Sequence, residues 1–120
     1  MHEFCWVEMV TEDSKAAQSF YGDLFGWSYE GVPMQNGQQY AMFQPEAGGP
    51  GGGIMHKPDP RLPTTWMPYV AVADLEAAVA KVATLGGSVQ VGPTPIPGRG
   101  SFAVIQDPTG GVIGLWRCEG

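Results

Sequence analysis

Residues 6–27, WVEMVTEDSKAAQSFYGDLFGW, decide the fold, because a second copy of their pattern follows later in the same chain. When the two copies are aligned, Asp13 meets Asp74 and Gly26 meets Gly87. Each copy has the pattern of a strand, an acidic helix start, a helix and a glycine stop. An internal repeat determines the architecture of a chain, so we interpret the sequence as two copies of one unit.

The repeat extends beyond the first helix into three further strands. The repeat units are residues 4–56 and 66–118. The expected strands are residues 4–10, 27–31, 39–44 and 53–56 in the first unit and 67–73, 88–91, 101–107 and 112–118 in the second. Loops are expected at residues 45–52 and 92–100, and Asn36-Gly37 predicts a hairpin turn. Each copy is therefore predicted to be a βαβββ unit.

The first strand alternates between two faces. Trp6, Glu8 and Val10 share one face, whereas Val7 and Met9 share the other. The second face is apolar, and we expect the first helix to cover it with an apolar stripe. The residues of that stripe are Ala17, Phe20, Tyr21 and Leu24.

Composition places limits on the partners of the chain. It has 120 residues, 43% hydrophobic content and a formal charge of -6, which predict one folded domain and argue against nucleic acid and anionic membranes as partners. No apolar run approaches the roughly twenty residues of a membrane span, and the first residues lack a secretion signal, so a soluble cytoplasmic protein is expected. Cys5 and Cys118 are expected to be reduced thiols.

Two local motifs and the order of the elements carry a family resemblance. The first helix ends in Phe20-Tyr21 followed by residues 24–27, LFGW, and a turn with the sequence DPTG at residues 107–110 precedes the last strand. With the βαβββ repeat, these features resemble the vicinal oxygen chelate superfamily of glyoxalase I, extradiol dioxygenases, fosfomycin-resistance enzymes and bleomycin-resistance proteins. The resemblance covers the whole chain. It implies an α+β fold in which residues 1–120 form one glyoxalase-like domain, with two tandem βαβββ units forming curved mixed half-barrels around a cleft.

The resemblance also implies four positions for metal ligands, one on the first strand and one on the last strand of each unit. In this sequence they are occupied by Trp6, Gly53, Met67 and Gly114. Catalytic divalent metals need imidazole and carboxylate ligands, and none of these residues supplies one. His2, His56, Glu8 and Asp107 do not form an alternative ligand set by their spacing, so we expect no metal or other cofactor.

The remaining candidate is a small-molecule site. Strand alternation predicts a lining of Trp6, Glu8, Val10, Gly53, Met55, Met67, Tyr69, Ala71, Gly114 and Trp116. Of these, the ligand-binding residues are expected to be Trp6, Glu8, Met55, Met67, Tyr69 and Trp116, because aromatic and thioether side chains around a polar anchor suit small molecules. Glu8 is the one inward charge and the candidate anchor or catalytic base. Alternatively, these side chains fill a collapsed half-barrel.

Three classes of function fit this sequence. The first is a metal-free binding protein, similar to bleomycin-resistance proteins, that sequesters or senses an aromatic or cationic ligand in a homodimer cleft. The second is a lyase, isomerase or dioxygenase, either with unorthodox metal ligands or metal-free with Glu8 as the base. The third is an interaction module that uses the fold for dimerisation.

Overall fold

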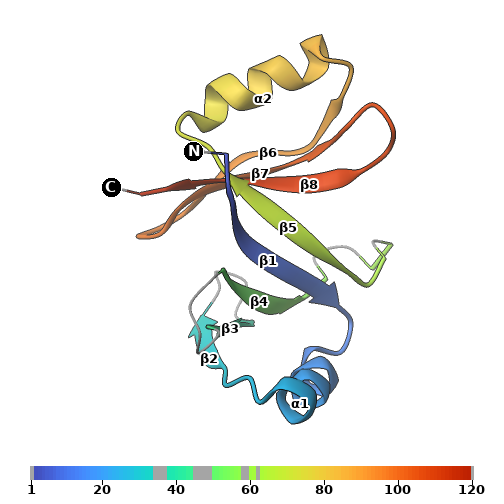
Figure 1. Cartoon of the computed structure of the whole chain (residues 1–120), viewed down its shortest axis with the longest axis vertical. Helices are drawn as coiled ribbons and strands as arrows, with labels where there is room; N and C mark the ends of the chain where they lie inside the picture. Colours follow the sequence, from blue (N-terminus) through green and yellow to red (C-terminus); the bar gives the residue numbers. More distant parts are fainter. Residues whose placement is uncertain (1, 34–37, 45–49, 58–59, 62, 120) are drawn as a thin grey trace. The chain divides into compact units, whose positions relative to one another are not determined.

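The computed structural model describes residues 2–33, 38–44, 50–57, 60–61 and 63–119 (Figure 1). The chain separates into two units. We call Trp6–Trp66 the N-terminal unit, and Met67–Gly120 together with Met1–Cys5 the C-terminal unit. No helix in the described ranges is long and apolar enough to cross a membrane.

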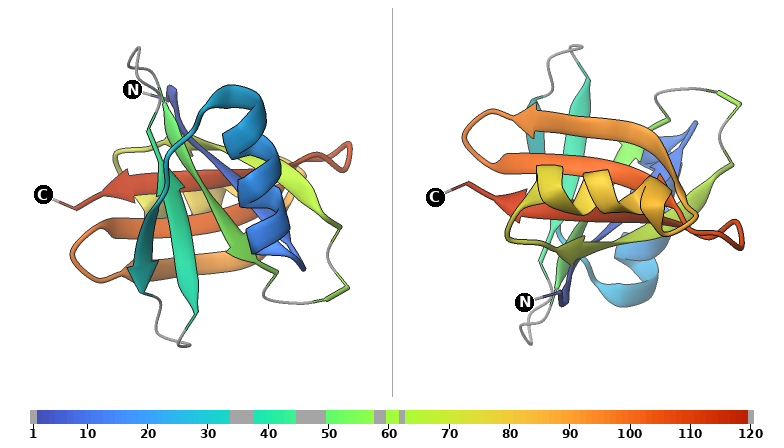
Figure 2. Two further views of the ribbon diagram at one scale, coloured as in Figure 1. Left: turned by 90° about the horizontal axis from the view of Figure 1, so that it is seen from below. Right: turned by 90° about the horizontal axis from the view of Figure 1, so that it is seen from above.

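The N-terminal unit consists of a mixed sheet and one helix. Its sheet has the order β2-β3-β4-β1, in which β1 and β4 are parallel and the other neighbours are antiparallel. The helix lies beside this sheet (Figure 2, left). The elements are β1 (Phe4–Thr11), α1 (Ser14–Phe25), β2 (Glu30–Pro33), β3 (Gln39–Phe43) and β4 (Gly51–His56).

The C-terminal unit has the same plan. Its sheet has the order β5-β8-β7-β6, with β5 and β8 parallel and the remaining pairs antiparallel. The helix α2 lies across the sheet of β6, β7 and β8 (Figure 2, right). The elements are β5 (Thr65–Ala71), α2 (Leu75–Thr84), β6 (Ser88–Ile96), β7 (Gly100–Gln106) and β8 (Val112–Cys118).

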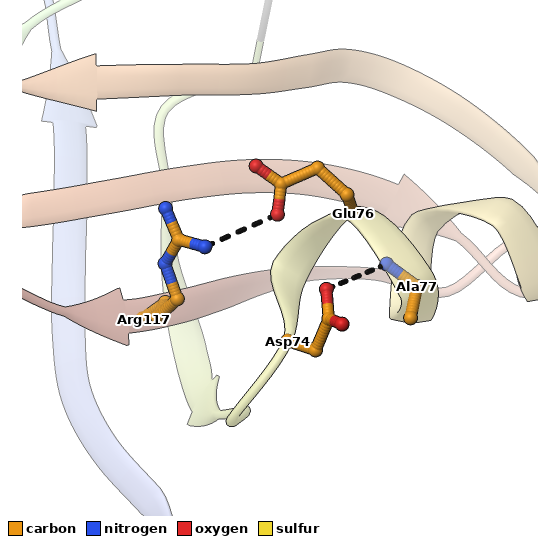
Figure 3. Close-up of polar contacts among 4 residues, drawn as sticks. All are labelled: Asp74, Glu76, Ala77 and Arg117. Atoms are coloured by element: carbon orange, nitrogen blue, oxygen red, sulfur yellow. Dashed lines mark hydrogen bonds and ion pairs between the residues drawn. The ribbon is translucent and has the colours of Figure 1, made fainter.

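Both helices begin at a repeated aspartate. The Asp13 carboxylate accepts from the Ala16 amide at 3.0 Å, and the Asp74 carboxylate accepts from the Ala77 amide at 3.0 Å (Figure 3). Each bond satisfies an amide that has no partner within its helix. At the other end of α1, Gly26 adopts φ 75°, a left-handed conformation that favours glycine and ends the helix.

The repeat predicted from the sequence is present in the structure. The helices begin at residues 14 and 75, the third strands at 39 and 100, and the fourth strands at 51 and 112, so each pair is offset by 61 residues. The predicted α+β class and the two βαβββ units are therefore confirmed. The turn at residues 107–110 is also confirmed, since the Gly110 amide donates to the Asp107 carbonyl at 3.1 Å.

Several boundaries differ from those predicted. The strand expected at residues 53–56 begins at Gly51, inside the expected loop 45–52, and the strand expected at 67–73 covers Thr65–Ala71. Residues 92–96 were predicted as loop, but β6 continues through them to Ile96 with irregular register against β7. A proline-rich strand is possible here because β6 lies at the edge of its sheet, where a missing amide donor faces solvent. Residues 27–29 were predicted as strand, but β2 begins only at Glu30. The Trp27 ring instead packs against the core, stacked on Phe43 at a centroid distance of 4.0 Å. The Asn36-Gly37 turn lies outside the described residues, although β2 and β3 pair as a hairpin.

The two helices pack differently on their sheets. Leu75 and Val82 of α2 are buried, whereas α1 has no buried residue. The predicted stripe of α1 is therefore partly wrong: Ala17 and Tyr21 pack against the core, but Phe20 and Leu24 are 59% and 58% exposed. The Tyr21 ring of α1 contacts the rings of Trp27 and Trp66 at centroid distances of 5.8 Å and 5.3 Å. The two cores are Met9, Ala41, Phe43 and Ile54 in the N-terminal unit and Val72, Leu75, Ala103 and Leu115 in the C-terminal unit.

Candidate functional site

A hydrogen-bonded aromatic group lies on the face of the N-terminal sheet opposite α1. The Trp6 indole N–H donates to the Tyr40 hydroxyl at 2.8 Å. The Tyr40 hydroxyl in turn forms a side-chain hydrogen bond with the Glu8 carboxylate. All three side chains are half-buried. Glu8, the candidate anchor, is thus held by a tyrosine of β3, the strand on the far side of β4 from β1.

The Tyr40 hydroxyl is held in its protonated form. Burial raises the pKa of Tyr40 far above its usual range, and the negative charge of Glu8 raises it further. The hydrogen bond from Trp6 opposes this shift, but burial dominates. At neutral pH the Tyr40 hydroxyl therefore donates its proton to the Glu8 carboxylate and accepts from the Trp6 N–H, so both of its hydrogen-bonding functions are used.

Gly53 makes room for the ring of Tyr40. In register, Gly53 lies between Glu8 of β1 and Met42 of β3. A Cβ atom built on Gly53 would overlap the Tyr40 ring, so the ring lies directly over the glycine backbone. Glycine is required at position 53 because the Tyr40 ring approaches the backbone closely, and not because the backbone adopts an unusual conformation.

The C-terminal unit repeats this arrangement with a different tyrosine. Tyr69 of β5 is buried and lies in register with Gly114 of β8. A Cβ atom on Gly114 would overlap the Tyr69 ring. Since Tyr69 is the repeat equivalent of Glu8 and Gly114 that of Gly53, both units place a tyrosine ring over the same glycine position, from different strands.

The other expected ligand-binding residues lie half-buried on their strands: Met55 on β4, Met67 on β5 and Trp116 on β8. The Trp116 indole N–H donates to the Cys118 sulfur at 3.3 Å, and the Cys5 thiol donates to the Tyr69 carbonyl at 3.6 Å. Both cysteines are free thiols, as predicted, and burial raises the pKa of Cys5. The six residues are thus distributed over the two units.

The four family metal positions do not fit a divalent ion. Trp6 uses its N–H to bind Tyr40, and the two glycine positions are covered by tyrosine rings. His56 is exposed at the end of β4. Asp107 has a role in its turn, because its carboxylate accepts from the Thr109 amide at 2.7 Å and the Gly111 amide at 3.1 Å, and the Thr109 side-chain and backbone bonds lower the pKa of Asp107 most. Within the described ranges, no three His, Cys, Asp or Glu residues group to hold a metal.

Sequence reasoning missed Tyr40. The residue lies on β3, and alternation from Met42, which pairs with Gly53, places it on the same face as Glu8. That step requires the register between β3 and β4, which was not known from the sequence. The repeat did not indicate Tyr40 either, because its equivalent in the second unit is Ser101.

The fold and these glycine positions define a protein of two βαβββ units in which tyrosine rings cover the glycines at the closing strands. Residues 4–115 match the family described as Glyoxalase/Bleomycin resistance protein/Dioxygenase superfamily. The chain belongs to this superfamily.

Curated relatives are longer than this chain. "Putative glyoxylase CFP32" of Mycobacterium tuberculosis (strain CDC 1551 / Oshkosh) is 35% identical over 95% of this chain and 45% of its own length. "Anthracycline biosynthesis protein DauV" of Streptomyces sp. (strain C5) is 28% identical over 93% of this chain and 46% of its own length. The chain thus spans about half the length of the curated relatives it matches.

Solved structures share the fold at low sequence identity. A hypothetical protein from Bacillus halodurans C-125 has a TM-score of 0.75 and 11% identity, covering 99% of this chain and 96% of its own. Methylmalonyl-CoA epimerase from Mycobacterium tuberculosis has a TM-score of 0.72 and 16% identity, covering 98% of this chain and 88% of its own. At these identities the likeness establishes the fold alone.

Proposed function

We propose that this protein is a metal-free, small-molecule-binding member of its superfamily, which sequesters or senses an aromatic ligand that is neutral or cationic. The observation that carries the proposal is the cover of tyrosine rings over Gly53 and Gly114, which replaces metal-binding carboxylates by aromatic surface. Aromatic faces attract planar rings and cations. The ligand would be recognised by its ring and not by oxygen atoms that chelate a metal.

Glu8 supplies the polar part of this proposed site. Glu8 is half-buried beside Trp6 and Tyr40, and its carboxylate accepts a hydrogen bond from the Tyr40 hydroxyl. An ionised carboxylate still has lone pairs for a second donor or for a cation. A bound cation would relieve the unfavourable burial of the negative charge. The relatives' names, which refer to a glyoxylase and to antibiotic biosynthesis, support a small molecule as the ligand.

Elemental analysis after native purification tests the metal-free part of the proposal. We expect no divalent metal at stoichiometric occupancy, because the four family positions hold Trp6, Gly53, Met67 and Gly114. About one nickel, zinc, manganese or iron ion per chain, lost on chelation together with an activity, would instead favour the enzyme interpretation.

A pair of isosteric probes tests the ligand part. N-methylquinolinium carries a positive charge, whereas 1-methylnaphthalene has nearly the same shape without one. We expect the cation to shift the tryptophan emission. We expect Glu8→Gln to weaken its binding about tenfold, because the neutral amide loses roughly 1.4 kcal/mol of charge–charge attraction in a partly buried site. Binding of 1-methylnaphthalene serves as the charge-independent control. If Glu8→Gln remains folded and binds the cation as well as the parent protein does, the anchor role is wrong.

A further inference from the structure

A second candidate site lies on the other face of the N-terminal sheet. A cavity of about 300 Å³, open to solvent on one side, lies between α1, the start of β4 and the core. Val7 lines it, whereas its neighbours Trp6 and Glu8 on β1 face the opposite side. The cavity is therefore separate from the site proposed above.

The walls of the cavity are mostly aromatic. Five of its eight lining residues carry aromatic rings, and none of the eight carries a charge. The Trp66 N–H donates to the Tyr21 hydroxyl at 3.1 Å, so these two polar groups satisfy each other. The main lining side chains are Val7, Tyr21, Phe25, Trp27, Phe43 and Trp66. An occupant would therefore contact apolar surface and ring faces.

The helix beside this cavity packs differently from its equivalent in the second repeat unit. The helix α2 buries Leu75 and Val82 against its own sheet, while the equivalent helix α1 buries no residue. The same βαβββ plan thus allows a closely packed helix, yet α1 buries no residue and contacts the rings of Trp27 and Trp66 through Tyr21. Apolar walls that face water are unfavourable, and an occupant that covers them would gain the contacts that they lack.

We propose that this cavity binds a neutral aromatic molecule of two fused rings. An apolar cavity of about 150 Å³ accommodates one benzene ring, and this one has about twice that volume. The rings of Trp27 and Phe43 are stacked, with centroids 4.0 Å apart and planes 11° apart, and the Trp66 ring is turned 77° from Trp27. Flat and edge contacts are therefore both available to an aromatic guest. Phe25 is 56% exposed and also lines the cavity, so the rim is accessible from solvent.

Naphthalene is the probe for this proposal. The chain is labelled with ¹³C in its valine methyl groups, and NOEs from naphthalene protons to the Val7 methyls are recorded. We expect NOEs to Val7, because its side chain lines the cavity. If naphthalene at its solubility limit gives no NOE to Val7, the proposal is overturned. The proposal is also overturned if isotope-filtered NOEs show that the Val7 methyls contact a second copy of the chain, because the cavity would then be occupied by protein.

Two phenylalanines of α1 give a matched pair of variants. Phe20 and Phe25 are 59% and 56% exposed on the same helix, but only Phe25 is among the lining residues. Phe25→Ala should weaken naphthalene binding about three- to tenfold, the range expected for one aromatic contact, and Phe20→Ala should leave it unchanged. Equal effects of the two substitutions would overturn the proposal.

A cavity-filling variant gives a second, independent measurement. Val7→Phe places a ring in the cavity, so we expect naphthalene binding to be lost and the thermal midpoint to rise. If folded Val7→Phe still binds naphthalene with the parent affinity, the cavity is not the site. Val7→Phe could overpack the core and unfold the chain. In that case the comparison of Phe25→Ala with Phe20→Ala still tests the proposal, because both side chains are more than half exposed and their removal should leave the protein folded.

Discussion

At the scale of single residues, Gly53 and Tyr40 depend on each other. The ring of Tyr40 occupies the space of a Gly53 side chain, and its hydroxyl links Trp6 to Glu8. The glycine thus determines the position of the tyrosine, and the tyrosine determines the position of the carboxylate. A substitution at Gly53 should therefore also change the position of the Glu8 carboxylate.

Gly53→Ala tests this dependence. We expect a loss of about 1–3 kcal/mol in the free energy of unfolding, because the new Cβ displaces the Tyr40 ring and breaks its hydrogen bonds. Urea denaturation measures the loss. Gly92→Ala is the matched strand control, since a Cβ there has no atom within 4 Å and should change stability by about 0.5 kcal/mol or less. A Gly53→Ala effect of the same size in a Tyr40→Ala background would contradict the coupling.

The shifted pKa of Tyr40 gives a pH prediction. Because burial raises this pKa in the folded state, the unfolded tyrosine releases its proton first as the pH rises. The folded state then binds more protons, so stability present at neutral pH falls once the pH exceeds about 10, the ordinary tyrosine value. Absorbance titration should find one tyrosine that ionises after the others, and Tyr40→Phe should remove it. Four equivalent tyrosine titrations in the folded parent protein would contradict this.

At the scale of elements, the two helices share their start and differ in their packing. Asp13 and Asp74 cap them in the same way. An ion pair between Arg117 and Glu76, at 3.2 Å, joins α2 to β8 (Figure 3). Both side chains are exposed, and ion pairs of this kind contribute little to the free energy of unfolding. The difference between the helices therefore comes from their apolar side chains, of which α2 buries two and α1 none.

Two leucine substitutions measure that difference. Leu75 is 0% exposed, so Leu75→Ala should lower the free energy of unfolding by about 2–5 kcal/mol. Leu24 is 58% exposed, so Leu24→Ala should lower it by about 0.5 kcal/mol or less. Chemical denaturation of the two variants, side by side, gives both values. Similar losses would show that α1 packs as tightly as α2.

At the scale of the whole molecule, we predict a homodimer. Phe4 and Phe20 each expose more than half of their surface, and apolar groups of this kind are commonly covered by a partner. The curated relatives are about twice as long as this chain, so two copies would match their length. Sedimentation at micromolar concentration should give about twice the chain mass of 12.8 kDa. A mass of one chain over the same range would contradict the prediction.

The sequence by itself determined the βαβββ repeat, the α+β class, the aspartate caps and the turn at residues 107–110. These features depend on local periodicity and on side-chain bonds within a few residues, so they can be predicted without the rest of the fold. The face of Trp6 and Glu8 on β1 followed from alternation in the same way. Only the tertiary structure placed Tyr40 over Gly53, and Trp27 and Trp66 against Tyr21 of α1, because strand register and ring packing depend on residues far apart in the chain.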